Sequence, residues 1–442
     1  MHLEVLSPTK NCSENCRRGH SVTMVFILIS VAYNEGSEAH IESSVVYPKV
    51  FEIRGVKILR LHDDLALVLE RSTVLGDTLA LLEDNGEGIR SEVINTKHIK
   101  RGLYHDVQHS ASVYLEERRD QVIVEGILGS ELRIEPMRPL SGRDDDSVAH
   151  RMYTVDTSKN YFGDVVHGPS HTHGSILSER AELPDSVTVD VCIVVDSVHN
   201  KTVMESGKSL HLYIAVLLNA VNMRYRQLKN PRFEVRLRAI MRFSHSQEKN
   251  KFNITGRTFH HDDFLPSFVD YISNSAFQPY DAVFLLTGRN MRGRAGTRTA
   301  GVAYLGTLCT EHRVGVGEDV PGSYSAVRTL AHEMLHIVGV MHDGVPPDKD
   351  HPGHPGAQGC SATKHIMAAT ASATNSHELS KCTQDQLTYF FINHDVKCWE
   401  SFNFTRTFPR ASLPGSKITA TAFCKLVYKK DAICGRVVAS RL

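Results

Sequence analysis

The sequence predicts an α/β fold for its second half, with a β-rich region before it. Three observations support this prediction. From Ser186 onward, β-branched runs alternate with segments whose apolar residues recur at helical spacing. Residues 40–183 instead hold short apolar runs that are separated by glycine and asparagine turns. Residues 331–344, AHEMLHIVGVMHDG, bring three histidines and a glutamate into one predicted helix and the turn that follows it.

The N-terminus carries an apolar run that is typical of a targeting segment. Residues 22–33, VTMVFILISVAY, are almost all apolar and follow Arg17 and Arg18. This length suits the core of a signal peptide and is too short for a membrane-spanning helix. We therefore predict that residues 1–39 are a signal peptide or an uncleaved anchor, with Met24 competing with Met1 as the true start.

Length and charge restrict the class of protein further. A chain of 442 residues is long enough for two or three domains. Its formal net charge is +0 and its pI is about 7.4, so nothing points to nucleic acid or to an anionic membrane as a partner. Beyond residues 22–33, no apolar run of the sequence approaches the length of a membrane span.

Residues 40–183 contain no cysteine and have the pattern of a separate region. The predicted strands are Val50–Ile58, Leu65–Leu69, Thr78–Leu82, Gln121–Ile127 and Ser130–Ile134. The polar, histidine-rich stretch 141–183 is predicted to be an exposed linker.

Residues 184–400 supply the α/β part. The predicted strands are Val187–Val195, Phe233–Phe243, Asp281–Thr287 and an edge strand at Gly301–Cys309. The predicted helices are His211–Tyr225 and Ser323–Val338, the second with Ser323 or Ser325 as its N-cap.

The spacing within residues 331–344 favours a zinc site. His332 and His336 lie one helical turn apart, so both imidazoles can reach one ion, and Glu333 can reach a water on an open position. Gly339 can end the helix, which lets His342 return as a third ligand. A polar helix face without metal and a closed structural zinc site are the alternatives. The closed site would need a fourth protein ligand and would leave Glu333 without a task.

This segment resembles a known family signature. H-E-x-x-H-x-x-G-x-x-H is the zinc motif of the metzincins, and Asp343 directly after it is similar to the adamalysin/reprolysin branch, which includes ADAM and ADAMTS proteins. Downstream, His365-Ile-Met-Ala368 resembles the Met-turn of that family, in which Met367 would form an apolar floor under the zinc histidines. The resemblance covers residues 185–400. In overall arrangement the chain also resembles salivary metalloproteases of ticks.

The resemblance implies roles for particular residues. The edge strand would bind extended peptide through Ala303, Leu305 and Gly306, and Ala368 to Thr370 would line a substrate pocket. Asp343 would orient the turn. Asp190 and Asp281 match two calcium-ligand positions of the family, and solvated carboxylates at strand ends are the alternative. The implied disulfides are Cys309 with Cys398 and Cys360 with Cys382, while Cys424 and Cys434 are left for each other or for partners in a missing C-terminal region.

Secretion would make disulfides the natural use of these cysteines. Seven cysteines follow the apolar run, and we expect the odd one to be Cys192, a small thiol inside a strand-like run. Asn200, Asn253 and Asn403 begin N-x-T triplets, which agree with a secretory route.

Residues 40–183 resemble the propeptide of the same family, with a cut expected near Arg180. This region has no cysteine that could cap the zinc as a thiolate, so the sequence leaves the latency mechanism open. His171 and His173 are candidates for contacts with the zinc, and a solvated linker is the alternative. Residues 401–442 resemble the truncated start of a disintegrin-like or Cys-rich segment.

The resemblance implies a secreted zinc metalloendopeptidase with Zn²⁺ as its cofactor, and calcium as a second ion. Its expected partners are extracellular protein substrates, such as fibrinogen or matrix proteins, and its own propeptide. Two alternatives remain at this point. The chain could be a toxin-like binding protein built on a protease scaffold, or an inactive zymogen whose propeptide stays associated.

Overall fold

A computed structural model describes residues 43–53, 55–118, 121–137, 148–157, 164–167, 182–293, 296–347, 353–369, 377–394 and 398. Several predictions concern residues outside these ranges: the targeting segment, His171, His173, Arg180, Thr370, and the tail 401–442 with Cys424 and Cys434. No helix in the described part of the chain is long and apolar enough to cross a membrane.

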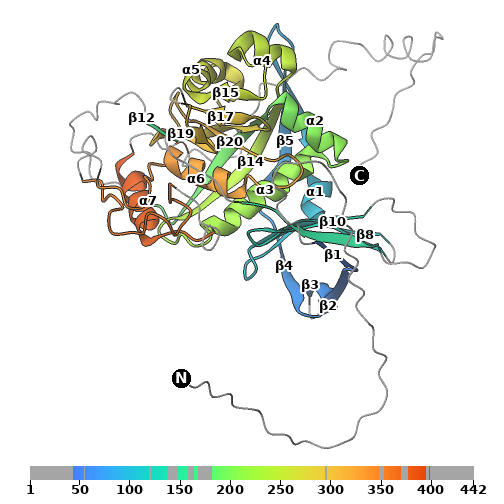
Figure 1. Ribbon diagram of the computed structural model, residues 1–442. Helices are drawn as coiled ribbons and strands as arrows, with labels where there is room; N and C mark the ends of the chain where they lie inside the picture. Colours follow the sequence, from blue (N-terminus) through green and yellow to red (C-terminus); the bar gives the residue numbers. More distant parts are fainter. Residues whose placement is uncertain are drawn as a thin grey trace, which may run out of the picture. The chain divides into compact units, whose positions relative to one another are not determined.

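A nine-stranded antiparallel sheet forms most of the β-rich N-terminal region (Figure 1). Its strands, in spatial order, are β1 (Ser43–Val46), β11 (His150–Thr154), β10 (Leu132–Pro136), β9 (Gln121–Leu128), β8 (Ala111–Arg118), β7 (Leu103–Asp106), β4 (Leu65–Arg71), β3 (Val56–His62) and β2 (Lys49–Ile53). Gly55, with φ of +79°, lies between β2 and β3, so the single predicted strand Val50–Ile58 is in fact a hairpin.

An eight-stranded mixed sheet carries the α/β part. Its strands, in spatial order, are β12 (Val165–His167), β19 (Gly301–Leu305), β20 (Val314–Glu318), β16 (Ala282–Thr287), β13 (Ser186–Val195), β14 (Arg232–Arg242), β5 (Leu75–Asp84) and β6 (Ile89–Asn95). The four strands from β20 to β14 run parallel to one another, whereas β19 is antiparallel to β20. Strands β5, β6 and β12 come from the N-terminal region, so the two parts of the chain share one sheet.

Helices cover both faces of this mixed sheet. They are α1 (Lys97–Gly102), α2 (Ser197–Glu205), α3 (Leu210–Tyr225), α4 (His245–Phe252), α5 (His261–Ile272), the short 3-10 helix η1 (Ser275–Phe277), α6 (Val327–Ile337) and α7 (Lys381–Asn393). A small third sheet is formed by β15 (Thr258–His260), β17 (Asn290–Arg292) and β18 (Arg298–Thr299).

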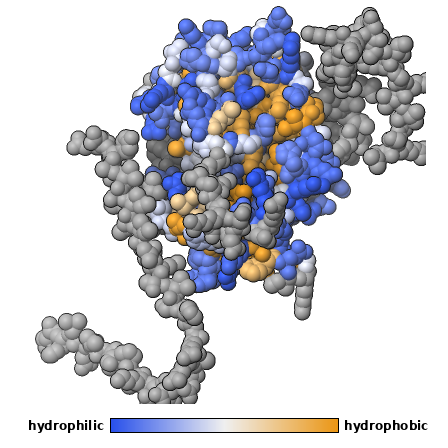
Figure 2. All heavy atoms as spheres, turned by 90° about the vertical axis from the view of Figure 1, so that its right-hand side faces the viewer, coloured by the Kyte–Doolittle hydropathy of each residue, from blue (hydrophilic) through white to orange (hydrophobic). Residues whose placement is uncertain are grey.

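Successive side chains of β13 belong to two different apolar cores, one on each face of the mixed sheet. Val191, Ile193 and Val195 belong to the apolar cluster that contains α3 and α6. Cys192 and Val194 belong to the cluster on the other face, which contains α5. Successive strand residues point to opposite faces, so one buried strand serves two cores. Figure 2 shows that the outer surface is mostly hydrophilic on the face turned to the viewer, with an apolar area between polar ones.

Helix α3 joins the two sheets. It packs on β14 of the mixed sheet and on β7 and β8 of the nine-stranded sheet (Figure 1). The sequence predicts one apolar face for this helix, yet the structure buries almost all of it. Two of its buried polar side chains contact the N-terminal region: Asn219 donates to the carbonyl of Tyr104 at 3.1 Å, and Arg224 donates to that of Gly129 at 3.0 Å.

Three sequence predictions are wrong in detail. The stretch 141–183 is not exposed throughout, because β11 and β12 lie within it and His150 and Asp164 are buried. Helix α6 begins at Val327 instead of Ser323, and neither Ser323 nor Ser325 caps it. The strand β19 is not at the edge of the sheet, because β12 pairs with it.

Candidate active site

Helix α6 positions the first two histidines of the site. His332 and His336 are both fully buried, and their Nε2 atoms are 3.0 Å apart. The helix ends before Gly339, whose φ of +77° is a conformation that glycine adopts at least cost. The turn that follows brings His342 back, with its Nε2 3.1 Å from that of His332. The structure thus assembles the three histidines that the spacing predicts.

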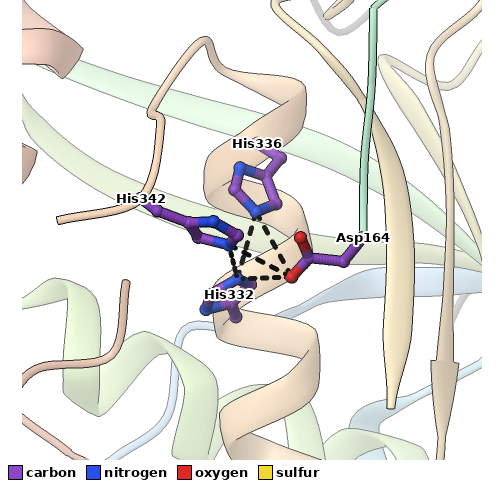
Figure 3. Close-up of side chains that lie close together, drawn as sticks. All are labelled: Asp164, His332, His336 and His342. Atoms are coloured by element: carbon purple, nitrogen blue, oxygen red, sulfur yellow. Dashed lines mark hydrogen bonds and ion pairs between the residues drawn. The ribbon is translucent and has the colours of Figure 1, made fainter. Parts of the chain in front are cut away.

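A fourth ligand atom lies among these three nitrogens (Figure 3). The Oδ2 atom of Asp164 is 3.0 Å from the Nε2 of His332, 3.2 Å from that of His342 and 3.8 Å from that of His336. Asp164 directly precedes β12 and is fully buried. Sequence reasoning missed this residue, because it lies in the stretch that was predicted to be a linker.

The hydrogen bonds of the imidazole Nδ1 atoms determine whether the Nε2 atoms that face the cluster carry a proton. His332 Nδ1 is 2.7 Å from the carbonyl of Ile366, and His336 Nδ1 is 2.7 Å from that of Val340. A carbonyl accepts, so each Nδ1 must carry the proton, and each neutral ring then turns an Nε2 lone pair towards the centre. Burial also lowers the pKa of His332 to about 3, which disfavours a second proton on that ring.

This donor set fits zinc. Three converging lone pairs and one carboxylate oxygen repel one another unless a cation lies between them. Ligands at 2.0–2.1 Å from a tetrahedral zinc ion are separated by about 3.3 Å, which is close to the separations seen here. One carboxylate and three imidazole nitrogens are also the ligand types that zinc takes in proteins.

Glu333 lies next to the first histidine, on the side of α6 that faces β19. Its side chain packs against the Cα of Gly301, where any larger residue would collide with it. Glu333 is fully buried, and neither carboxylate oxygen has a hydrogen-bond partner among the described residues. Burial raises the pKa of Glu333 well above its usual value, and the nearby charge of Asp164 raises it further.

The turn around Met367 is hydrogen-bonded to His332 and to Asp343, which directly follows His342. Met367 is fully buried, its carbonyl accepts the N–H of Asp343 at 2.9 Å, and the carbonyl of the preceding Ile366 binds His332. Arg328 of α6 donates to the carbonyls of His365 and Ile366, both at 3.1 Å. Sequence reasoning did not find Arg328, because an arginine within a helix carries no signal for this contact.

Asp343 links the third histidine to α7. Its Oδ1 accepts the hydroxyl of Ser380 at 2.6 Å, and Ser380 also caps that helix. Burial raises the pKa of Asp343. These contacts are structural ones, in agreement with the orienting role that the resemblance implies.

Comparison with known proteins places this geometry in a family. Residues 188–401 match the model of the reprolysin (M12B) family of zinc metalloproteases. Residues 188–401 are therefore a zinc metalloprotease domain of the reprolysin family. The fold of this enzyme accords with the metzincin-like catalytic domain that the sequence predicts, preceded by a β-rich region.

Venom metalloproteinases of scorpions are among the relatives of this reprolysin. An antarease-like venom metalloproteinase of Tityus trivittatus is 28% identical over 80% of this chain and 92% of its own length. The venom metalloproteinase antarease of Tityus serrulatus is 27% identical over the same shares. Among solved structures, metalloproteinase-II from Bacteroides fragilis is 14% identical over 74% of this chain and 87% of its own, with a TM-score of 0.38.

The reprolysin has the two disulfides that the resemblance implies. Cys309 is bonded to Cys398, and Cys360 to Cys382. The second bond ties the loop before Met367 to the start of α7. Cys192 is a free, buried thiol, as its place in the strand predicts. Its pKa is raised by burial, which makes it a packing residue and not a nucleophile.

The predicted calcium ligands have other contacts. The carboxylate of Asp190 is 3.4 Å from Arg236 and 3.1 Å from Arg238, and an oxygen of Asp281 accepts the N–H of Asp190 at 2.8 Å. Two guanidinium groups beside Asp190 compensate its charge and repel a second cation. Calcium at Asp190 and Asp281 therefore stays a prediction that these contacts do not favour.

The predicted substrate-binding residues are close to the histidines, but β12 covers part of them. Val165 pairs with Ala303 and His167 with Leu305, and Gly306 donates to the carbonyl of His336 at 2.9 Å. Ala368 is buried behind the Met367 turn. The strand that would receive a peptide is thus present, with a segment of the same chain bound to it.

Proposed function

We propose that this reprolysin is a secreted endopeptidase that cleaves extracellular proteins once residues before the catalytic domain have been cut from it. The observation that supports this proposal most is the position of Glu333, which follows His332 on α6 and packs its buried carboxylate against Gly301 of β19. A scaffold that only bound partners would have no need of an unpartnered carboxylate at that position.

Each residue then has a task in peptide hydrolysis. Zinc held by His332, His336 and His342 would supply a Lewis acid for water and for the scissile carbonyl. Glu333 accepts the proton of the attacking water and returns it to the leaving amine. Burial raises the pKa of this carboxylate, which suits a group that must both take and return a proton.

The main chain of β19 would position the substrate. Once β12 has left, the free edge of β19 offers N–H and C=O groups to an extended peptide, which any polypeptide sequence can use. Ala368, beside Met367, would then line the pocket for the residue after the cut. We further propose, from the likeness to tick salivary enzymes, that fibrinogen or matrix proteins are among the substrates.

The test uses the full chain with the site of a sequence-specific protease inserted between residues 168 and 181. After folding with zinc and cutting at that site, the wild type should cleave casein. Glu333→Gln, which keeps the shape of the side chain, should lower kcat/KM by about 10²–10⁴-fold. A chelator should abolish cleavage and added zinc should restore it.

Fibrinogen and collagen then replace casein in a second arm, which tests the substrate proposal alone. A folded, zinc-loaded and cut wild type that leaves casein intact would favour the binding-protein alternative.

A further inference from the structure

The carboxylate of Asp164 is held more tightly within the histidine cluster than a linker residue would be. Its Oδ2 lies within 3.2 Å of two imidazole nitrogens and 3.8 Å from the third. Its backbone is fixed as well, because the carbonyl of Asp164 accepts the N–H of Ala303 at 2.9 Å. Strand pairing on β19 therefore points this side chain at the metal site (Figure 3).

Among the described residues, neither a lysine nor an arginine forms an ion pair with the carboxylate of Asp164. It is fully buried, and in the described part of the chain its ion-pair partners are the three histidines alone. Two of these histidines hold their Nδ1 protons on backbone carbonyls, so their Nε2 atoms are acceptors that face another acceptor. A carboxylate buried in this way is costly unless it binds a cation.

The strand that follows Asp164 occupies the peptide-binding surface. Val165, Val166 and His167 pair in parallel with Ala303, Tyr304 and Leu305. Each N–H and C=O of a strand edge serves one neighbour at a time, so a substrate cannot pair with these residues of β19 while β12 is in place. The metal position and the adjoining strand edge are thus covered by four consecutive residues.

We propose that Asp164 is the fourth ligand of the metal in the uncut chain, and that Asp164 with β12 keeps the enzyme latent. This inference rests on the proposed function, because latency needs an activity to restrain. The Asp164 carboxylate takes the position that water needs, and β12 takes the edge that substrate needs. Activation then requires that residues 164–167 leave the site.

The test measures access to the metal and not catalysis. The full, uncut chain is prepared with Glu333→Gln, which prevents self-cleavage, and is loaded with one equivalent of Zn²⁺ or Co²⁺. Acetohydroxamate, a small chelating probe, is titrated into the wild-type Asp164 chain and into Asp164→Asn and Asp164→Ala. Asp185→Asn, which changes an exposed aspartate just before β13, is the matched control.

We expect Asp164→Ala to bind acetohydroxamate about 100-fold more tightly, since an intramolecular ligand competes at high effective concentration. The Asp185→Asn control should bind it as weakly as the unchanged chain. The cobalt absorption bands should shift in both Asp164 variants and not in the control. Release of zinc to a chelator should be about 10–100-fold faster when the carboxylate is lost.

Equal probe affinity and equal cobalt spectra in all chains would overturn the proposal. Asp164→Asn keeps the size of the side chain, so a change confined to Asp164→Ala together with a lost near-UV circular dichroism signal would also count against direct ligation. If the uncut chain blocks the probe and the cut enzyme leaves casein intact, the latency proposal stands for the metal and the proposed function fails. A chain that binds no zinc contradicts both.

Discussion

The N-terminal region adds strands to both edges of the mixed sheet, and the two edges differ. At one edge, β5 and β6 extend the sheet beyond β14, and Leu79, Ala80 and Leu82 are buried in its two cores. At the other edge, β12 has three residues, and Val165 and Val166 are only half-buried. The first edge is an anchor that contributes to stability, whereas the second can leave with little loss of apolar contact.

This difference indicates how the N-terminal region can stabilise the catalytic domain at one edge and cover its peptide-binding strand at the other. Burial of large apolar side chains stabilises the β5 edge. The β12 edge has few such contacts and depends on Asp164 and the metal. A cut between residues 168 and 181 would remove the covalent link between β12 and β13, while the β5 edge would stay paired with β14.

The largest expected effect comes from the anchor. Leu79→Ala should lower the free energy of unfolding by about 2–5 kcal/mol, since it leaves a cavity at a fully buried position. Val165→Ala, at the other edge, should cost below about 1 kcal/mol. Urea unfolding of the two uncut, zinc-loaded variants measures both values. Equal losses would show that the two edges do not differ as described.

Arg133 makes a second contact between the N-terminal region and the catalytic domain. This buried residue of β10 donates to the carbonyls of Ser323 at 2.8 Å and Tyr324 at 3.1 Å, in the loop before α6. Arg133→Met leaves those carbonyls without their donor and should cost about 3 kcal/mol. Arg151→Met on neighbouring β11 is the control, since it removes an exposed ion pair with Glu135 and a cation–π contact with Tyr153 and should cost below about 1 kcal/mol.

Asp319 holds the same loop from the catalytic side. Its oxygens accept the hydroxyl of Tyr213 at 2.6 Å and the N–H of Ala326 at 3.0 Å, and one lies 2.9 Å from His199. Burial raises the pKa of Asp319, but these partners more than offset it and leave that pKa below its usual value.

A lowered carboxyl pKa in the folded state means that this stabilisation is present above the unfolded pKa and is lost as pH falls through the folded one. Asp319→Asn should therefore cost about 2 kcal/mol near pH 7. The gap from wild type should narrow below about pH 4, the ordinary range of an aspartate. Denaturant unfolding at a series of pH values measures the gap, and a gap independent of pH would contradict this account.

The smallest effect concerns backbone dynamics. Amide protons of Val165 and Val166 should exchange with solvent at least about tenfold faster than those of Ala80 to Leu82, because short edges open locally more often than core strands. Hydrogen exchange on the uncut, zinc-loaded chain measures both sets. Slower exchange at β12 than at β5 would contradict the comparison.

Part of the active site could be predicted because it is local in sequence. His332, Glu333, His336, Gly339 and His342 follow from helical periodicity and from the special backbone of glycine, and the structure places them accordingly. The strand β13 and the helix α3 could be found for the same reason. The start of α6 was wrong by four residues because Ser325 donates to Asp319 and does not cap the helix.

By itself, the amino-acid sequence determined the histidine triad, the position of Glu333 and the order of the α/β elements, since each depends on spacing along a few turns of chain. Only the tertiary structure decided that Asp164 meets His332, a residue 168 positions away. A contact of this kind leaves no periodic signal near either residue, because chain folding and not local geometry brings the two together. The same reason hid the shared sheet, in which β5 and β12 join strands that follow much later in the chain.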